Sequence, residues 1–158
     1  GQEPYSISAA SLKSWPDICN FDFKILATDV DPEILDAAKS GEYGIEEVSR
    51  IPVQYRDLMF PKLARGDLKV DSKLSLPITF ARLNLVSNWP MSRKFDVIFC
   101  RNVAIYFDKA TQVRLWERFY NILAPGGTLC IGHSERLSGS SESKFESIGV
   151  TMYRRIET

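Results

Sequence analysis

"FKILATDVDPEILDAAKSG" (residues 23–41) is predicted to form a strand, a short acidic turn and a helix. We expect the strand over 23–31. Pro32 suits a first helical turn, and Gly41 is a typical helix end. The alternation continues, with strands expected at 78–85, 95–100 and 128–133 and a helix at 109–123. Strands that alternate with helices predict an α/β fold with a mostly parallel sheet covered on both faces.

The composition places limits on the class of protein. The 158 residues are enough for one domain with a core, which we expect over 1–158. Charged residues make up 25% and balance in sign, which argues against a nucleic-acid partner. The sequence has no run of eighteen apolar residues, so no membrane insertion is expected. Cys19, Cys100 and Cys130 fit reduced thiols of a cytoplasmic protein better than a disulfide framework or a zinc site.

Ligands of parallel sheets bind outside the carboxyl ends of the strands, so the residues just past each strand end are the candidates for a site. Asp29 and Asp31 follow the first of these strands. An acid in this place can accept both hydroxyls of a ribose, or it can cap the helix that begins at Pro32. Asp31 directly precedes the proline and suits the cap. Asp29 is the better ribose candidate.

Two further strand ends carry polar side chains. Asn84 would hydrogen-bond an adenine edge while Leu85 packs on its face, or Asn84 is simply a turn residue. Arg101 and Asn102 directly follow a buried strand, where polar groups are costly unless they face a site or a partner. The Tyr106 hydroxyl would reach the same mouth. In the alternative interpretation, Arg101 forms an ion pair at the sheet end and Tyr106 is a core aromatic.

The stretch "GHSE" (residues 132–135) holds the single histidine, His133. A lone histidine at a strand end is more often structural than catalytic. The stretch lacks the glycines on both sides of the serine that a nucleophile elbow needs. No second histidine is present to complete a metal site, and we expect no metal. We interpret Gly132–Glu135 as a tight transition from strand to loop at the rim of the pocket.

Four blocks of sequence together resemble one family. They are "GQEPYSI" (1–7), "ILATDVDPEILDAAKSGEYG" (25–44), "FDVIFCRNVAIYFDKATQ" (95–112) and "LAPGGTLCIGHSE" (123–135). In this order and spacing they resemble the catalytic domain of the chemotaxis receptor methyltransferases, the CheR family. The resemblance implies the Rossmann-like class I fold of enzymes that use S-adenosylmethionine (SAM) and release S-adenosylhomocysteine (SAH). It also implies methyl transfer to glutamates on the cytoplasmic helical bundle of chemoreceptors, forming methyl esters.

Two other functions stay open. One is a class I methyltransferase that acts on a small molecule. The other is a module that binds SAM, SAH or a receptor without turnover.

Carried over by position, the resemblance assigns residues to the cofactor and to the methyl group. The implied cofactor contacts are Glu3 (amino-acid portion), Asp29 (ribose hydroxyls), Asn84 and Leu85 (adenosine), and Arg101 and Asn102 (the floor beneath the cofactor). Arg101 and Tyr106 are the implied catalytic residues, with Tyr106 near the transferring methyl, where it orients the substrate carboxylate.

The resemblance also bears on the limits of the fold. In the family, the glycine-containing turn that ends in a sequence like "GQEPYSI" follows the first strand, so that strand and an N-terminal helical domain would lie outside this chain. We therefore expect an unpaired sheet edge, open to another copy or another segment, and reduced affinity or activity. Residues 46–80 correspond to an inserted small antiparallel β subdomain. In some members it grips a receptor peptide with a glycine-rich loop, whereas "KLARGDLKV" (62–70) has one glycine.

Overall fold

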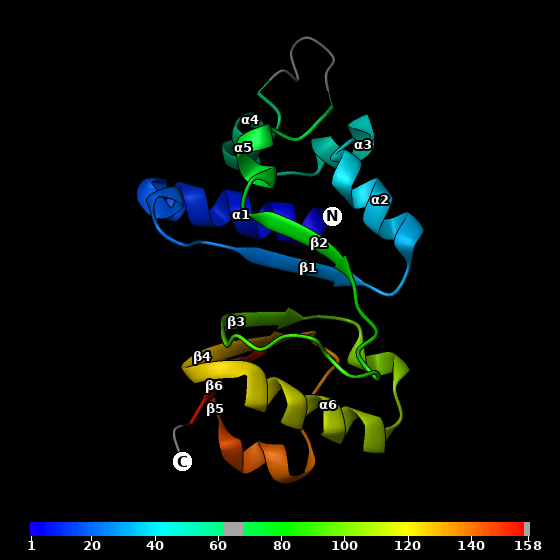
Figure 1. Cartoon of the computed structure of the whole chain (residues 1–158). Coiled ribbons are helices and arrows are strands. Elements are labelled where there is room, and N and C mark those ends of the chain that lie inside the picture. Colours follow the sequence, from blue (N-terminus) through cyan, green and yellow to red (C-terminus); the bar gives the residue numbers. More distant parts are fainter. Residues whose placement is uncertain (62–67, 157–158) are drawn as a thin grey trace. The chain divides into compact units, whose positions relative to one another are not determined.

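The structure is a computed structural model that describes residues 1–61 and 68–156. The chain forms two compact units, Gly1–Asn84 and Leu85–Thr158 (Figure 1). The single domain expected over 1–158 stays a prediction.

The first unit combines helices with a pair of parallel strands. Its elements are α1 (Gln2–Ser14), η1 (Pro16–Asn20), β1 (Ile25–Asp29), α2 (Pro32–Ser40), α3 (Ile45–Ser49), α4 (Val53–Met59), α5 (Ser72–Ser75) and β2 (Ile78–Arg82). β1 and β2 pair from Ile25 opposite Ile78 to Asp29 opposite Arg82. Both arrows in Figure 1 therefore end at the same edge, where the chain turns into α2.

The core of this unit is built around an aromatic residue of α1. Tyr5 is buried, and its hydroxyl donates a hydrogen bond of 2.9 Å to the carbonyl of Ala38 on α2. Its ring meets that of Tyr43 edge-on, and Val48 and Phe60 are buried in the same cluster. This hydrogen bond and the aromatic packing hold the beginning of α1 against the end of α2.

The antiparallel β subdomain predicted for residues 46–80 is not what the described residues form. They form most of α3, all of α4 and α5, and the start of β2, which pairs parallel with β1; Lys69 makes one antiparallel bridge with Glu42, which lies before the range. Local caps explain the helices: the Glu47 side chain accepts from the Gly44 amide, and the Asp71 side chain accepts from the Lys73 amide. For the described residues the prediction is therefore wrong. Most of the "KLARGDLKV" stretch, residues 62–67, lies outside them.

The second unit has a four-stranded sheet. Its elements are β3 (Phe95–Cys100), η3 (Ala104–Tyr106), α6 (Lys109–Ile122), β4 (Leu123–Ile131), η4 (Gly139–Lys144), β5 (Phe145–Gly149) and β6 (Met152–Arg155). The strand order is β3-β4-β6-β5. β3 and β4 are parallel, while β6 pairs antiparallel with both β4 and β5.

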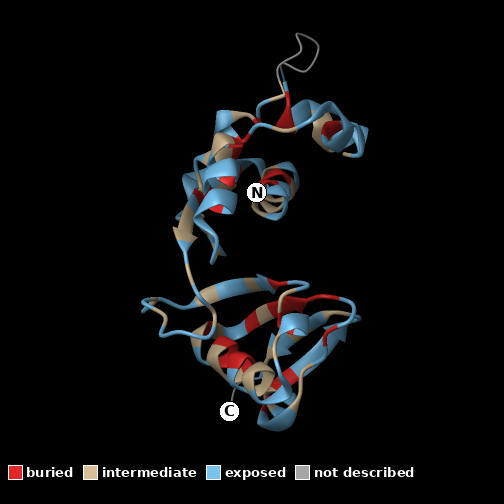
Figure 2. Cartoon of the chain, turned by 90° about the vertical axis from the view of Figure 1, so that its right-hand side faces the viewer, coloured by how far each residue is buried: buried red, intermediate tan, exposed pale blue. Residues whose placement is uncertain are grey.

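The helix predicted over 109–123 is confirmed as α6, and its spacing of apolar residues explains its packing. Leu115, Trp116 and Phe119 are buried on one face and form a cluster with Leu129 and Ile131 of β4. Figure 2 shows buried stretches along both helix and strands of this unit. Side chains at this helical spacing share a face, so α6 covers the parallel pair β3–β4. That packing fixes the loop that joins β3 to α6.

Each unit has a strand edge without a backbone partner among the described residues. β1 pairs only with β2, and β3 pairs only with β4 within residues 1–61 and 68–156. The prediction that another copy or another segment occupies such an edge stays a prediction.

Candidate functional site

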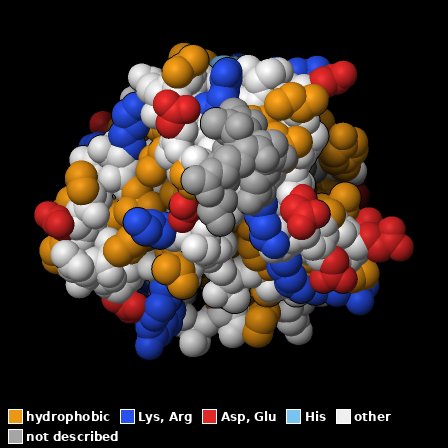
Figure 3. Space-filling model, turned by 90° about the horizontal axis from the view of Figure 1, so that it is seen from above, with side chains coloured by type: hydrophobic (Ala, Val, Ile, Leu, Met, Phe, Trp, Pro, Cys, Tyr) orange, Lys and Arg blue, Asp and Glu red, His pale blue; other side chains and the backbone are white. Residues whose placement is uncertain are grey.

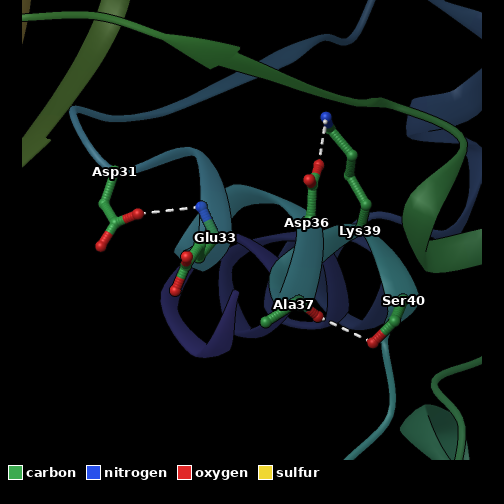
Figure 4. A network of polar contacts seen from close by, with 6 residues as sticks. All are labelled: Asp31, Glu33, Asp36, Ala37, Lys39 and Ser40. Carbon is green, nitrogen blue, oxygen red and sulfur yellow. Dashed lines mark hydrogen bonds and ion pairs between the residues drawn. The ribbon is translucent and has the colours of Figure 1, made fainter.

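The turn after β1 is shaped by its two acids. One Asp29 oxygen, Oδ1, accepts the backbone amide of Asp31 at 3.0 Å. Asp31 in turn accepts the amide of Glu33 at 2.8 Å and caps α2 (Figure 4). Asp31 therefore has the capping position that the sequence predicts. Asp29 lies two residues before this cap and is half-buried at the carboxyl end of β1.

The beginning of α1 lies at the same end of the first unit. A Cβ at Gly1 would stand 3.0 Å from both the Ala38 Cβ and the Tyr43 hydroxyl, so the close approach to α2 favours glycine. Gly1 lies close enough to Asp29 and Glu47 for their charges to act on it. Glu3 lies in the first turn of α1, whose N-cap has no side-chain hydrogen bond. The structure thus brings the turn that carries Glu3 near to Asp29.

Asn84 follows β2 at this edge as well. The Leu83 amide donates to the Asp29 carbonyl at 2.9 Å, which continues the contact of the two strands past the end of β2. Asn84 is the next residue, so Asp29 and Asn84 lie at the same edge of the β1–β2 pair.

Leu85 is fixed to α6 in the second unit. The Arg118 guanidinium donates to the Leu85 carbonyl at 2.8 Å and lies over the Trp89 ring at 3.9 Å from its centroid. Burial lowers the pKa of Arg118. Leu85 lines a cavity of about 260 Å³ together with residues that include Phe107 and Leu115. The cavity thus combines apolar side chains with polar ones, among them Asn88, Thr111 and Arg114, beside a backbone segment that Arg118 holds.

The loop between β3 and α6 carries three of the predicted site residues. Arg101 and Asn102 follow β3 directly, and Tyr106 closes the short helix η3. Asn102 has a φ of 59°, the left-handed region that residues other than glycine rarely adopt. The Tyr106 side chain is 81% exposed, so the alternative of a core aromatic is wrong.

Glu135 is a feature of this loop that the sequence did not reveal. It is 4% exposed, and its carboxylate accepts backbone amides from Asn102, Val103, Ala104 and Gly132. The sequence predicts a tight turn at the pocket rim for Gly132–Glu135 and assigns no partner to Glu135. The one signal in the sequence is that Glu135 follows a buried strand and Gly132 by only a few residues.

The other polar side chains that the structure describes do not form a metal site. His133 is exposed. Within the described ranges no group of three or more His, Cys, Asp or Glu side chains is placed to hold a metal ion. In the same part of the chain no helix has both the length and the apolar character needed to cross a bilayer. On the face seen in Figure 3, acidic and basic side chains are interspersed with apolar ones.

Comparison with known sequences decides the family. The model of the family described as "CheR methyltransferase, SAM binding domain" matches residues 1–154. The chain belongs to this CheR family. A probable chemotaxis protein methyltransferase of Rhizobium etli is 46% identical over 157 residues, covering 98% of this chain and 59% of the relative. The chemotaxis protein methyltransferase of Escherichia coli is 38% identical, covering 97% of this chain and 54% of the relative.

The CheR match confirms the predicted family, its class I SAM methyltransferase fold and SAM as the cofactor. Among solved structures, the N-methyltransferase NodS of Bradyrhizobium japonicum aligns at a TM-score of 0.49 and 14% identity, over 85% of this chain and 74% of that chain. The chain spans 59% and 54% of the two CheR relatives named above.

Proposed function

We propose that the protein transfers the methyl group of SAM to glutamate side chains on the cytoplasmic helical bundle of chemoreceptors, forming glutamyl methyl esters in the cytoplasm. The observation that carries the proposal is the match of the CheR SAM binding domain over residues 1–154. It is supported by the position of Asp29, Arg101 and Asn102 directly at the ends of parallel strands.

The first unit suits the polar parts of SAM. The beginning of α1, whose N-cap Gly1 makes no side-chain hydrogen bond, would attract the carboxylate of the methionyl portion. Glu3 in that turn would bind the amino group. Asp29, at the end of β1 and beside this turn, would accept the ribose hydroxyls. Asn84, at the same edge, would contact the adenosine.

The second unit supplies apolar side chains in a cavity of mixed lining, and a polar loop. Leu85, which lines the cavity with Phe107, would pack against the adenosine. Arg101 and Asn102 would form the floor beneath the cofactor. Tyr106, with its exposed side chain, would orient the carboxylate of the acceptor glutamate.

Such a site needs few catalytic groups. SAM supplies a methyl group on an activated sulfonium. A glutamate side chain is already ionised at neutral pH, so the protein need not provide a general base. Its contribution is to hold the acceptor carboxylate in line, and orientation of this kind is worth at most about 7–11 kcal/mol.

Transfer of a radioactive methyl group from SAM to a purified receptor fragment tests the proposal. We expect label on the receptor that alkali releases, as it does from an ester. A fragment whose acceptor glutamates are replaced by alanine is the matched control and should stay unlabelled. Label on free small acids, but not on the receptor, would indicate a small-molecule methyltransferase. SAH binding without any transfer would indicate a binding module.

We also propose that the chain associates with itself through a strand edge. β3 has an edge without a partner among the described residues, and Val97 and Phe99 on it are 47% and 42% exposed. Such edges invite pairing with another strand. Size-exclusion chromatography with light scattering should show a dimer or larger species, and a monomer at all concentrations would contradict the proposal.

A further inference from the structure

The Glu135 carboxylate collects the amides of the loop after β3. Oε1 accepts from Val103 at 3.0 Å and from Ala104 at 2.7 Å. Oε2 accepts from Asn102 at 3.2 Å and from Gly132 at 2.5 Å. Three consecutive loop amides thus point to one buried carboxylate. Backbone amides that converge in this way form a concave site for an anion, and here the protein supplies the anion itself.

The same loop is held from the opposite side by α6. The Gln112 side-chain amide donates to the Ala104 carbonyl at 2.9 Å and to the Phe107 carbonyl at 3.0 Å. Glu135 therefore binds the loop through its N–H groups, and Gln112 binds it through its C=O groups. Ala104, which is bound by both, is fully buried.

The hydrogen bonds of Glu135 and Gln112 to the loop, called the clamp below, maintain an unfavourable backbone conformation. A non-glycine residue in the left-handed region is strained and persists only where its surroundings enforce it. Asn102 is such a residue, and its amide is one of the Glu135 donors. The space is tight as well, because a Cβ at Gly132 would stand 2.8 Å from Glu135 Oε2 and 2.9 Å from the Asn102 nitrogen.

We infer that Glu135 is a positioning residue: its carboxylate sets the conformation of the loop that presents Arg101, Asn102 and Tyr106, without itself touching the cofactor. The inference rests on the proposed function, because the resemblance assigns these three residues to the cofactor floor and the methyl group. The inference adds Glu135, about 30 residues further along the chain, as the residue on which the placement of these three depends.

The variant Glu135→Gln tests the inference. The glutamine NH₂ group would face backbone amides that are donors themselves, so part of the clamp is lost while the volume is kept. Two controls match it: Glu142→Gln, on an exposed glutamate of η4, and Phe145→Leu, which weakens the core of the same unit. SAH affinity is measured by calorimetry, and the amide resonances of Val103 and Ala104 are followed by NMR.

We expect Glu135→Gln to shift both resonances and to weaken SAH binding about 10-fold or more, since hydrogen bonds to charged groups are the strong ones. Glu142→Gln should change neither quantity. Phe145→Leu should lower the melting temperature with SAH affinity kept, which separates positioning from stability.

The outcomes distinguish the inference from the proposed function. If the unmodified chain binds no SAH, the proposed function fails and the inference fails with it. If the unmodified chain binds and Glu135→Gln binds equally well, or its loop resonances do not move, the inference alone fails. Should Glu135→Gln not fold, Glu135→Asp keeps the charge and shortens the reach of the carboxylate to the loop amides. Unchanged SAH affinity in that variant would equally overturn the inference.

Discussion

The turn after β1 and the loop after β3 both carry predicted site residues, yet they are held in different ways. In the first, Asp29 and Asp31 each accept an amide two residues further along the chain. In the second, Glu135 accepts amides that lie 31 to 33 residues before it. The first turn is thus built by its own sequence, whereas the second depends on a distant residue.

The comparison predicts different costs for the two anchors. Glu135→Ala should lower the free energy of unfolding by about 3 kcal/mol or more, because several buried donors lose their acceptor at roughly 1–3 kcal/mol each. Urea unfolding followed by tryptophan fluorescence measures this. The matched variant Glu142→Ala should stay within about 0.5 kcal/mol of the unmodified chain. Equal effects of the two variants would remove the basis of the comparison.

Gly132→Ala sharpens the same point by adding an atom instead of removing a bond. The new Cβ would press on Glu135 Oε2 and on the Asn102 nitrogen, so the carboxylate and the loop must move apart. Overpacking of this kind costs typically about 1–3 kcal/mol. The change in urea midpoint gives the cost. A Gly132→Ala chain as stable as the original would mean that the clamp is looser than the distances indicate.

Asp31→Ala tests the locally built turn. Loss of the N-cap of α2 should cost about 1 kcal/mol, and less than loss of Glu135. The ellipticity at 222 nm during urea unfolding reports it. A loss from Asp31→Ala as large as that from Glu135→Ala would contradict the distinction between local and distant anchoring.

The smallest effect concerns the end of the β3 loop, where Asp108 caps α6. Its hydrogen bond from the Thr111 amide is the main reason that the pKa of this carboxyl lies below 3.8. A lowered pKa in the folded state means that the contribution to stability is present above the unfolded-state value and is lost as the pH falls through the folded-state value. Asp108→Asn should therefore lose less stability than the original chain as the pH falls from about 5 through the folded-state pKa of Asp108. Parallel curves for the two proteins would contradict this.

What could be predicted from the sequence follows the same division. The helix after Asp31 was predictable because cap, proline and final glycine are neighbours in the chain. The spacing of Leu115, Trp116 and Phe119 likewise predicted α6. In both cases the residues that determine the helix are neighbours in the sequence.

Other features depend on residues that are far apart. The clamp of Glu135 on Ala104 spans 31 residues, and no pattern of spacing announces it. For residues 46–80, the antiparallel subdomain that the resemblance implied is replaced among the described residues by helices with local caps such as Asp71. The strand predicted over 128–133 begins earlier, at Leu123, and ends at Ile131, with a shift of register between Phe95 and Val97 where β3 pairs with it.

The most direct test of the account is a calorimetric titration of the chain with SAH, comparing Asp29→Asn with Asp31→Asn. Asn at position 29 can still accept the Asp31 amide, so the turn survives while the charge that the ribose would meet is removed. We expect Asp29→Asn to weaken SAH binding by roughly 1–3 kcal/mol, and Asp31→Asn, which still caps α2, to leave it unchanged. Equal SAH affinity in the unmodified chain and in Asp29→Asn would contradict the assignment of this strand end to the cofactor.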